Sequence, residues 1–288
     1  MSSLTTHERQ GPHSDISLDA RVLRWRGAGL ARRVVVFLHG LGDTADVWRP
    51  VMSAWPGAPI AALAPDFPGH GGTPPACPDD YTVPALTRWS ASLLARERLP
   101  SVVLVGHSLG GRVALELAND PALNVESLII LDVGPDASND TGSILSNHLD
   151  VLAAGAPSIS LFVARLAARL PLADRAALAS VVRAQVAASR QPDDSGVRVR
   201  LDPEIKRLLG GADQSDGWSL LSTLPCPGTV IRGSFSGVLN EATARRMAAS
   251  MPCGGTHIAL PGAGHALALE QPQRLARALH SVLEGESL

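Results

Sequence analysis

Residues 104–113 read LVGHSLGGRV and place a serine between two glycines at the spacing G-x-S-x-G. An apolar, strand-like run comes directly before this motif, and an apolar helical segment begins at Val113 directly after it. A strand that turns abruptly into a helix holds the central residue, Ser108, in a strained conformation and lifts its hydroxyl clear of the sheet. Side chains at Gly106 and Gly110 would collide with such a turn. The stretch therefore predicts a nucleophile elbow with Ser108 as the nucleophile.

Two backbone N–H groups are expected beside that serine. The Leu109 N–H lies at the start of the predicted helix, where the helix dipole favours a developing negative charge. The second donor is expected in the HGLG stretch, residues 39–42, which follows the first long apolar strand. We assign it to the Leu41 N–H, with His39 and Gly40 beside it as oxyanion-site or substrate-binding residues. The glycines allow the backbone to approach a bound carbonyl closely.

A candidate base lies near the C-terminus, in the stretch PGAGHA at residues 261–266. His265 stands there on a glycine-rich loop after the last apolar strand, where it can reach over the sheet to Ser108. A weakly acidic hydroxyl needs such a base within about 3 Å. The spacing of the other histidines considered suggests no metal site, and turn or surface positions are expected for them: His39, His70, His107 and His257.

Apolar runs and helical stretches alternate through the chain. Further strand-like runs occur at residues 34–38, 60–64, 128–131, 229–231 and 258–260. Continuous apolar strands that alternate with helices predict a parallel sheet covered on both faces. Two more polar, alternating segments, residues 16–18 and 22–25, are typical of an antiparallel edge hairpin.

From about residue 136 the strand pattern gives way to helical periodicity. One apolar helical face is predicted to contain Ile159, Phe162, Val163, Leu166 and Leu170, and Asp174 is expected to cap the next helix. Cap arginines such as Arg165 and Arg169 are expected on solvated faces. We predict a helical cap over residues 136–218, inserted into a core of residues 16–135 and 219–288, with a flexible N-terminus over residues 1–15.

Composition and charge exclude several classes of protein. The 288 residues are 45% hydrophobic and 18% charged, which is typical of a globular chain with one large core. Lys+Arg 25 against Asp+Glu 27 leave a net charge of −2, too small to recruit nucleic acid or an acidic membrane surface. Three scattered cysteines, no apolar run of about 18 residues and no apolar leader segment predict a cytoplasmic protein. A small-molecule substrate is expected, and the oligomeric state is left open.

Taken together, the motifs resemble the α/β-hydrolase superfamily over nearly the whole chain. Landmarks of that family occur in the expected order: HGLG at 39–42, DFPGHGGT at 66–73, GHSLGG at 106–111, LDVGP at 131–135 and GAGH at 262–265. The resemblance implies an α/β fold with a mostly parallel, eight-stranded sheet and a helical cap between the sixth and seventh strands. It also implies a Ser/acid/His triad that needs no cofactor and no metal.

The acid of the triad departs from the family pattern. In many relatives it follows the seventh strand in a pattern like R-G-x-x-S-D-x-L, whereas residues 232–239 read RGSFSGVL with Gly237 at the position of the acid. Asp132 ends the sixth strand, at the edge of the sheet where open α/β folds bind ligands. We assign Asp132 as the acid that holds the His265 tautomer. A dyad without an acid and a different carboxylate remain the alternatives.

Three functions are compatible with this pattern. The first is a serine hydrolase, in which the Ala/Leu/Val-rich cap favours a small-to-medium, largely apolar ester, thioester or lactone. The second is a cofactor-independent dioxygenase, C–C hydrolase or lyase on the same fold; in the dioxygenases His265 would act on the substrate while Ser108 merely binds it. The third is a non-catalytic ligand receptor.

Overall fold

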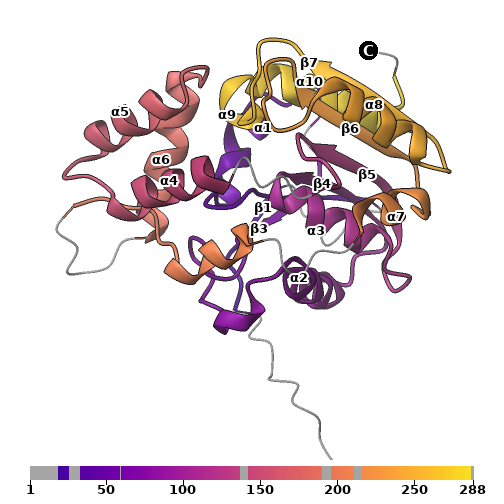
Figure 1. The fold of residues 1–288 in the computed structure, drawn as a ribbon, viewed down its shortest axis with the longest axis horizontal. Coiled ribbons are helices and arrows are strands. Elements are labelled where there is room, and N and C mark those ends of the chain that lie inside the picture. The colour runs from indigo at the N-terminus through magenta and orange to yellow at the C-terminus, as the bar shows by residue number, and fades with distance from the viewer. Residues whose placement is uncertain are drawn as a thin grey trace, which may run out of the picture.

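A computed structural model gives the fold and describes residues 19–25, 33–58, 60–136, 142–189, 196–210 and 216–286. One sheet of seven strands runs through them in the order β1-β3-β2-β4-β5-β6-β7 (Figure 1). The strands are β1 (Val22–Trp25), β2 (Val34–Leu38), β3 (Ala62–Pro65), β4 (Val102–His107), β5 (Val125–Leu131), β6 (Gly228–Gly233) and β7 (Gly255–Leu260). All neighbours pair in parallel except β1, which runs antiparallel to β3 at the edge.

The prediction of a mostly parallel sheet is confirmed, and its strands lie in the predicted apolar runs. The described residues contain seven strands rather than the expected eight. Residues 22–25 form the expected antiparallel edge strand, while residues 16–18, the other half of the predicted hairpin, lie outside the described residues. None of the described helices is both long and apolar enough to cross a membrane.

Side chains on both faces of the sheet are buried. In β2, Val35 and Phe37 join one apolar cluster while Val36 and Leu38 join another, because successive side chains of a strand point to opposite faces. The first face is covered by α1 (Arg49–Ser53) and α10 (Pro272–Glu284), and the second by α2 (Val83–Glu97), α3 (Leu109–Ala118) and α8 (Glu241–Ser250). This double burial explains the unbroken apolar runs of the strands.

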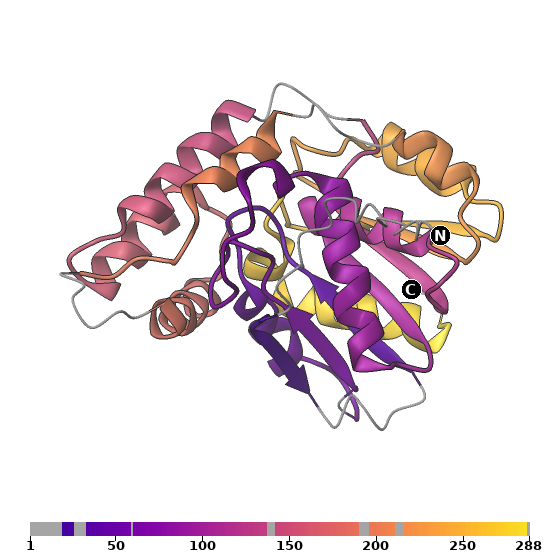
Figure 2. The ribbon, with the colours of Figure 1, turned by 90° about the horizontal axis from the view of Figure 1, so that it is seen from below.

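Three helices between β5 and β6 form a separate lobe beside the sheet, namely α4 (Gly142–Ala154), α5 (Ile159–Arg169) and α6 (Arg175–Ser189) (Figures 1 and 2). Asp174 Oδ1 accepts a hydrogen bond of 2.8 Å from the Ala177 N–H, which confirms the predicted N-cap. Phe162 and Leu166 of α5 are buried in the same apolar cluster as one face of the sheet. The apolar face of α5 therefore packs the lobe against the core.

The chain returns from this lobe over the loop that follows β3. Leu201 forms an antiparallel bridge with His70, and the Asp202 N–H donates to Gly69 O at 2.8 Å. The buried Tyr81 hydroxyl donates to Asp202 Oδ2 at 2.5 Å. The return then continues through the 3-10 helix η5 (Pro203–Leu209) to α7 (Gly217–Ser222), which packs against α3 and α8. These contacts fix the lobe relative to the loops at the carboxyl edge of the sheet.

A buried charge cluster holds the loops around the start of β1. The Arg21 guanidinium lies 2.9 Å from Asp46 and 3.0 Å from Asp66, and both carboxylates are fully buried. Asp66 also accepts hydrogen bonds from the Ala45 N–H at 2.7 Å and the Gly72 N–H at 2.8 Å, so it organises the turn that contains it. Asp46 is also paired with Arg49 at 2.6 Å, so removal of the Arg21 guanidinium would leave the buried Asp66 carboxylate without a cation.

Replacement of Arg21 by methionine is expected to lower the free energy of unfolding by about 3–5 kcal/mol, because it leaves the buried Asp66 carboxylate without a cation. The matched control is Arg24→Met, whose partner Glu97 lies 2.5 Å away with both side chains partly exposed. Loss of that surface pair is expected to lower the stability by less than about 1 kcal/mol. Urea unfolding of both variants measures the difference, and equal losses would contradict the assignment.

Candidate functional site

Ser108 occupies a sharp turn between β4 and α3. Its backbone has φ 52° and ψ −118°, a region that residues other than glycine rarely adopt. A Cβ at Gly106 would lie 2.2 Å from Gly110 O, and a Cβ at Gly110 would lie 2.2 Å from Leu38 O. The turn can therefore close against the end of β2 only because both positions are glycine. The structure has the strand-to-helix turn expected from residues 104–113.

An acid–base pair lies at the same edge of the sheet. Asp132 follows β5 with φ 52° and is fully buried. His265 lies between β7 and α9 (Leu267–Glu270), with its Nδ1 at 2.8 Å from Asp132 Oδ2 and 26% of its side chain exposed. The parallel strands thus bring together two residues that are 133 positions apart. His265 and Ser108 line one cavity, although no hydrogen bond joins the Ser108 hydroxyl to the imidazole in this structure.

The segment at residues 232–239, which has Gly237 where many relatives have the acid, forms hydrogen bonds with Asp132. The Gly233 N–H donates to Asp132 Oδ1 at 2.9 Å, and the Ser236 hydroxyl donates to Oδ2 at 2.5 Å. Ser236 Oγ in turn accepts hydrogen bonds from the Val238 and Leu239 N–H groups at 3.0 and 3.2 Å, which directs its proton toward the carboxylate. Hydrogen bonds to a carboxylate are stronger than neutral ones. The sequence motif quoted above contains Ser236, but its spacing alone does not reveal this contact.

His107, expected at a turn or surface position, is instead buried next to the candidate base. Its Nε2 lies 2.8 Å from His265 O, and the two imidazole rings are 4.8 Å apart. Burial lowers the pKa of His107 to about 3, and the nearby His265 acts in the same direction, so the ring is neutral. Since a carbonyl oxygen only accepts, Nε2 carries the proton and Nδ1 keeps a free lone pair. His107 therefore positions the backbone of His265.

Glu270 also holds the loop that carries His265. Its Oε2 accepts a hydrogen bond from the Gly264 N–H, directly before His265. Burial raises the pKa of Glu270, opposed by its hydrogen bonds from the backbone. The loop that carries the imidazole is thus held at two points, the Gly264 N–H and the His265 carbonyl.

The loop after β2 is fixed by two buried, neutral histidines rather than by a turn alone. His39 Nδ1 lies 2.8 Å from Gly40 O, and its Nε2 accepts a hydrogen bond of 2.9 Å from the Phe67 N–H. Burial lowers the pKa of His39 to about 4. Since both ring nitrogens serve the backbone and the ring does not line the cavity, His39 holds the loop instead of contacting a substrate. This differs from the expected oxyanion-site or substrate-binding position.

His70 does the same for the next residues of that loop. Its Nε2 accepts a hydrogen bond of 3.2 Å from the Gly42 N–H, and its Nδ1 lies 3.0 Å from Pro68 O. Burial lowers the pKa of His70 to about 3. Gly40 and Leu41, the other expected residues of the oxyanion site, line the cavity, while Leu109, the first residue of α3, is buried in an apolar cluster and is not among the lining residues.

A cavity of about 420 Å³ lies between the lobe and these loops. Its walls are mostly aliphatic side chains from α4, α5 and α6, including Leu152, Leu166, Leu178, Val181 and Val182. Polar residues line it as well, namely Asp43, His107, Ser108, His148, Arg169, Gln185, His265 and Glu270. Arg169 is exposed, as expected of the arginines in this segment, but its position in the C-terminal turn of α5 also places it among the residues that line the cavity.

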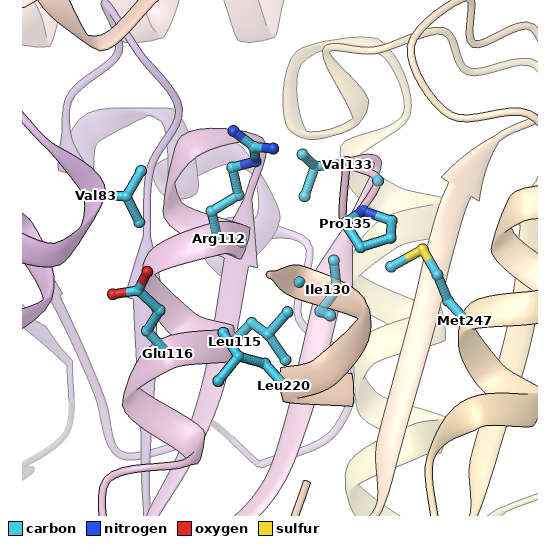
Figure 3. Close-up of a pocket in the computed structure, with 12 residues that line it drawn as sticks. Val83, Arg112, Leu115, Glu116, Ile130, Val133, Pro135, Leu220 and Met247 are labelled. Atoms are coloured by element: carbon cyan, nitrogen blue, oxygen red, sulfur yellow. The ribbon is translucent and has the colours of Figure 1, made fainter. Parts of the chain in front are cut away.

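A second hollow lies elsewhere, between α3, α7 and α8 (Figure 3). Its walls include Arg112, Glu116, Leu220 and Met247, and it shares no lining residue with the cavity above Ser108. Its volume of about 20 Å³ has room for roughly one water molecule. The larger cavity is therefore the candidate functional site.

The mostly parallel sheet with helices on both faces is the architecture of the alpha/beta hydrolases. A model of the alpha/beta hydrolase family matches residues 35–278, and the chain belongs to this family. The esterase Rv0045c of Mycobacterium tuberculosis is 31% identical over 266 residues, which cover 91% of this chain and 85% of that protein. A crystal structure of that esterase superposes with a TM-score of 0.75 at 26% identity, over 92% of this chain and 89% of the other. E-2-(acetamidomethylene)succinate hydrolase shares the fold with a TM-score of 0.76 at 22% identity, over 92% and 95% of the two chains.

Replacement of Gly110 by alanine is expected to destabilise the protein by about 3 kcal/mol, because the new methyl group overlaps the backbone of β2. Gly237→Ala is the control, since a Cβ there meets no atom within 4 Å. Thermal unfolding of both variants makes the comparison. A Gly110→Ala protein as stable as the control would show that the turn does not depend on this close approach.

Proposed function

We propose that this protein is a serine esterase that cleaves small-to-medium, largely apolar esters, thioesters or lactones through an acyl-enzyme on Ser108. One observation carries the proposal: His265, paired with the buried Asp132, and Ser108 in its strained turn line one largely aliphatic cavity. Residues 136–218 act as the cap of this site. The substrate is a small molecule, and a cytoplasmic location is expected.

In the first half of the reaction, His265 Nε2 takes the proton of the Ser108 hydroxyl while Oγ attacks the carbonyl carbon. The Leu41 and Leu109 N–H groups donate to the oxyanion that forms. The tetrahedral intermediate then collapses, the imidazolium gives its proton to the leaving alcohol or thiol, and the acyl group remains on Ser108. In the second half, His265 deprotonates a water molecule, whose attack releases the carboxylic acid and restores the serine.

Asp132 keeps the proton of His265 on Nδ1 and stabilises the imidazolium that forms in each half. Its own oxygens are held by the Gly233 N–H and the Ser236 hydroxyl, so that the carboxylate cannot turn away from the ring. The His107 ring contacts the backbone carbonyl of His265 and so holds the loop segment that carries this imidazole.

The aliphatic walls from the cap support an apolar substrate, since such a cavity gains mainly by removing apolar surface from water. The relatives named above are an esterase and a hydrolase, which favours ester hydrolysis over dioxygenase or lyase chemistry and over a non-catalytic receptor. No specific observation favours a second function.

Ser108→Ala is expected to abolish both ester turnover and covalent labelling by a fluorophosphonate probe, because the probe reacts only with an activated serine. The control is Ser250→Ala, which removes an exposed hydroxyl that donates to Arg246 O on α8. Peptide mass spectrometry locates the adduct, and 4-nitrophenyl butyrate reports turnover. Turnover that survives in the Ser108→Ala variant would overturn the acyl-enzyme mechanism.

Asp132→Asn is expected to lower kcat by about 10⁴-fold, because the imidazole loses the carboxylate that sets its tautomer. Adding Gly237→Asp should restore at least about tenfold of this loss, since a second acid then enters from the loop after β6. Position 237 lines the cavity with His265 and has free space for a side chain. Gly237→Asp alone is the control. An Asp132→Asn variant that keeps most of its kcat would favour a dyad or a different carboxylate.

A further inference from the structure

Asp43 brings an additional carboxyl group into the cavity, directly after the loop proposed to bind the oxyanion. Its backbone N–H donates to Gly40 O at 3.1 Å, which closes a tight turn and directs the side chain back over Gly40. The carboxyl lines the cavity, and no described residue forms a hydrogen bond with it. The mechanism above gives this group no task.

His107 Nδ1 is a second hydrogen-bond acceptor that the mechanism does not use, and it lies near the Asp43 carboxyl. A methyl group on Gly40 would lie 3.3 Å from Asp43 Oδ2 and 3.1 Å from His107 Nδ1. The two atoms thus converge on one point above Gly40, although they are not hydrogen-bonded to each other. His107 Nδ1 has no described donor, since the proton of that ring is on Nε2 and is given to His265 O.

Both atoms are hydrogen-bond acceptors near neutral pH. His107 stays neutral because burial lowers its pKa to about 3. Burial raises the pKa of Asp43 to about 7, an effect that the nearby His265 opposes, and the carboxyl oxygens accept a hydrogen bond in either protonation state. Asp43 is partly exposed to the cavity, so a ligand that displaces solvent from the two acceptors must offer them a donor in its place. No described residue donates to either atom.

We propose that Asp43 and His107 Nδ1 bind a hydrogen-bond-donating substituent of the substrate, a hydroxyl or ammonium group on the carbon next to the scissile carbonyl. Gly40 directly precedes Leu41, whose N–H is assigned to the oxyanion, so the point between the two acceptors lies beside the carbonyl. The preferred substrates are then esters or thioesters of 2-hydroxy or 2-amino acids with an aliphatic remainder. This inference rests on the proposed esterase function.

A site of this kind discriminates against a substrate that lacks the donor, because its two acceptors are then desolvated without compensation. Discrimination by the aliphatic walls is weaker, since an added or missing methylene changes binding only modestly. Asp43 is therefore a specificity-determining residue, and its effect appears in the ratio between two substrates rather than in one rate.

The test compares N-acetylcysteamine thioesters of butyric, 2-hydroxybutyric and 2-aminobutyric acid. For each protein we take the ratio of kcat/KM between a substituted thioester and the plain one, which cancels effects common to both. Asp43→Ala is expected to lower the ratio for the preferred substituent by at least about tenfold relative to the unmodified protein. Asp43→Asn retains a carbonyl acceptor, so it keeps a preference for a hydroxyl but loses one for an ammonium group. The two variants together identify the donor.

The control is Asp79→Ala, which removes a carboxylate that is 99% exposed and lies 3.8 Å from Arg207. It should leave both ratios unchanged. Ratios that are equal in Asp43→Ala and in the unmodified protein would overturn the inference, while normal fluorophosphonate labelling of Ser108 in both would leave the esterase proposal standing. If Ser108 is not labelled, calorimetric binding of butyramide and 2-hydroxybutyramide decides the question without turnover. A preference for the hydroxylated amide that disappears in Asp43→Ala supports the subsite, and equal binding refutes it.

Discussion

The close approach of the Ser108 turn to the end of β2 is the constraint on which the rest of the site depends. Gly110 leaves no room for a Cβ against Leu38 O, so the start of α3 packs directly on the backbone of the neighbouring strand. This contact fixes Ser108 at the carboxyl edge of a parallel sheet, where the loops after the other strands also end. Asp132, His265 and the residues around Leu41 reach one point because their strands run in the same direction. The site is assembled from segments that are far apart in the sequence. Its side chains therefore come together only when the strands pair in this order.

Neutral, buried histidines provide the second level of this organisation. His39, His70 and His107 are all desolvated, and the consequent fall in their pKa values keeps each ring uncharged. An uncharged imidazole offers one donor and one acceptor, so it can link a carbonyl of one loop to an N–H of another. His39 and His70 use both nitrogens in this way on the loop after β2. His107 uses only one, which is why its second nitrogen remains available in the cavity.

The sequence could predict those features that depend on local chemistry. Periodicity located the strands, since a strand buried on both faces must be apolar throughout, and the glycines around Ser108 indicated the turn. The spacing could not show that Ser236 donates to Asp132, because this contact depends on the register of β6 beside β5. Arg169 is exposed as predicted, but its place in the lining of the cavity was missed for a related reason. Helical periodicity assigns a residue to a face, but only the packing of α5 decides whether that face meets solvent or a cavity.

The polar groups of the cavity are divided between the two parts of the fold. Ser108, His265 and Asp43 come from loops of the sheet, whereas the cap contributes mostly aliphatic walls. The loops are locked by glycine contacts and buried hydrogen bonds, so the groups proposed to act near the scissile carbonyl are preorganised. The lobe is joined to the core through the return of the chain at Leu201 and Asp202, through its apolar face, and through the Asp174 N–H, which donates to Leu269 O at 2.8 Å. Under the proposed function, recognition next to the carbonyl therefore falls to the sheet loops, and recognition of the aliphatic remainder falls to the helical lobe.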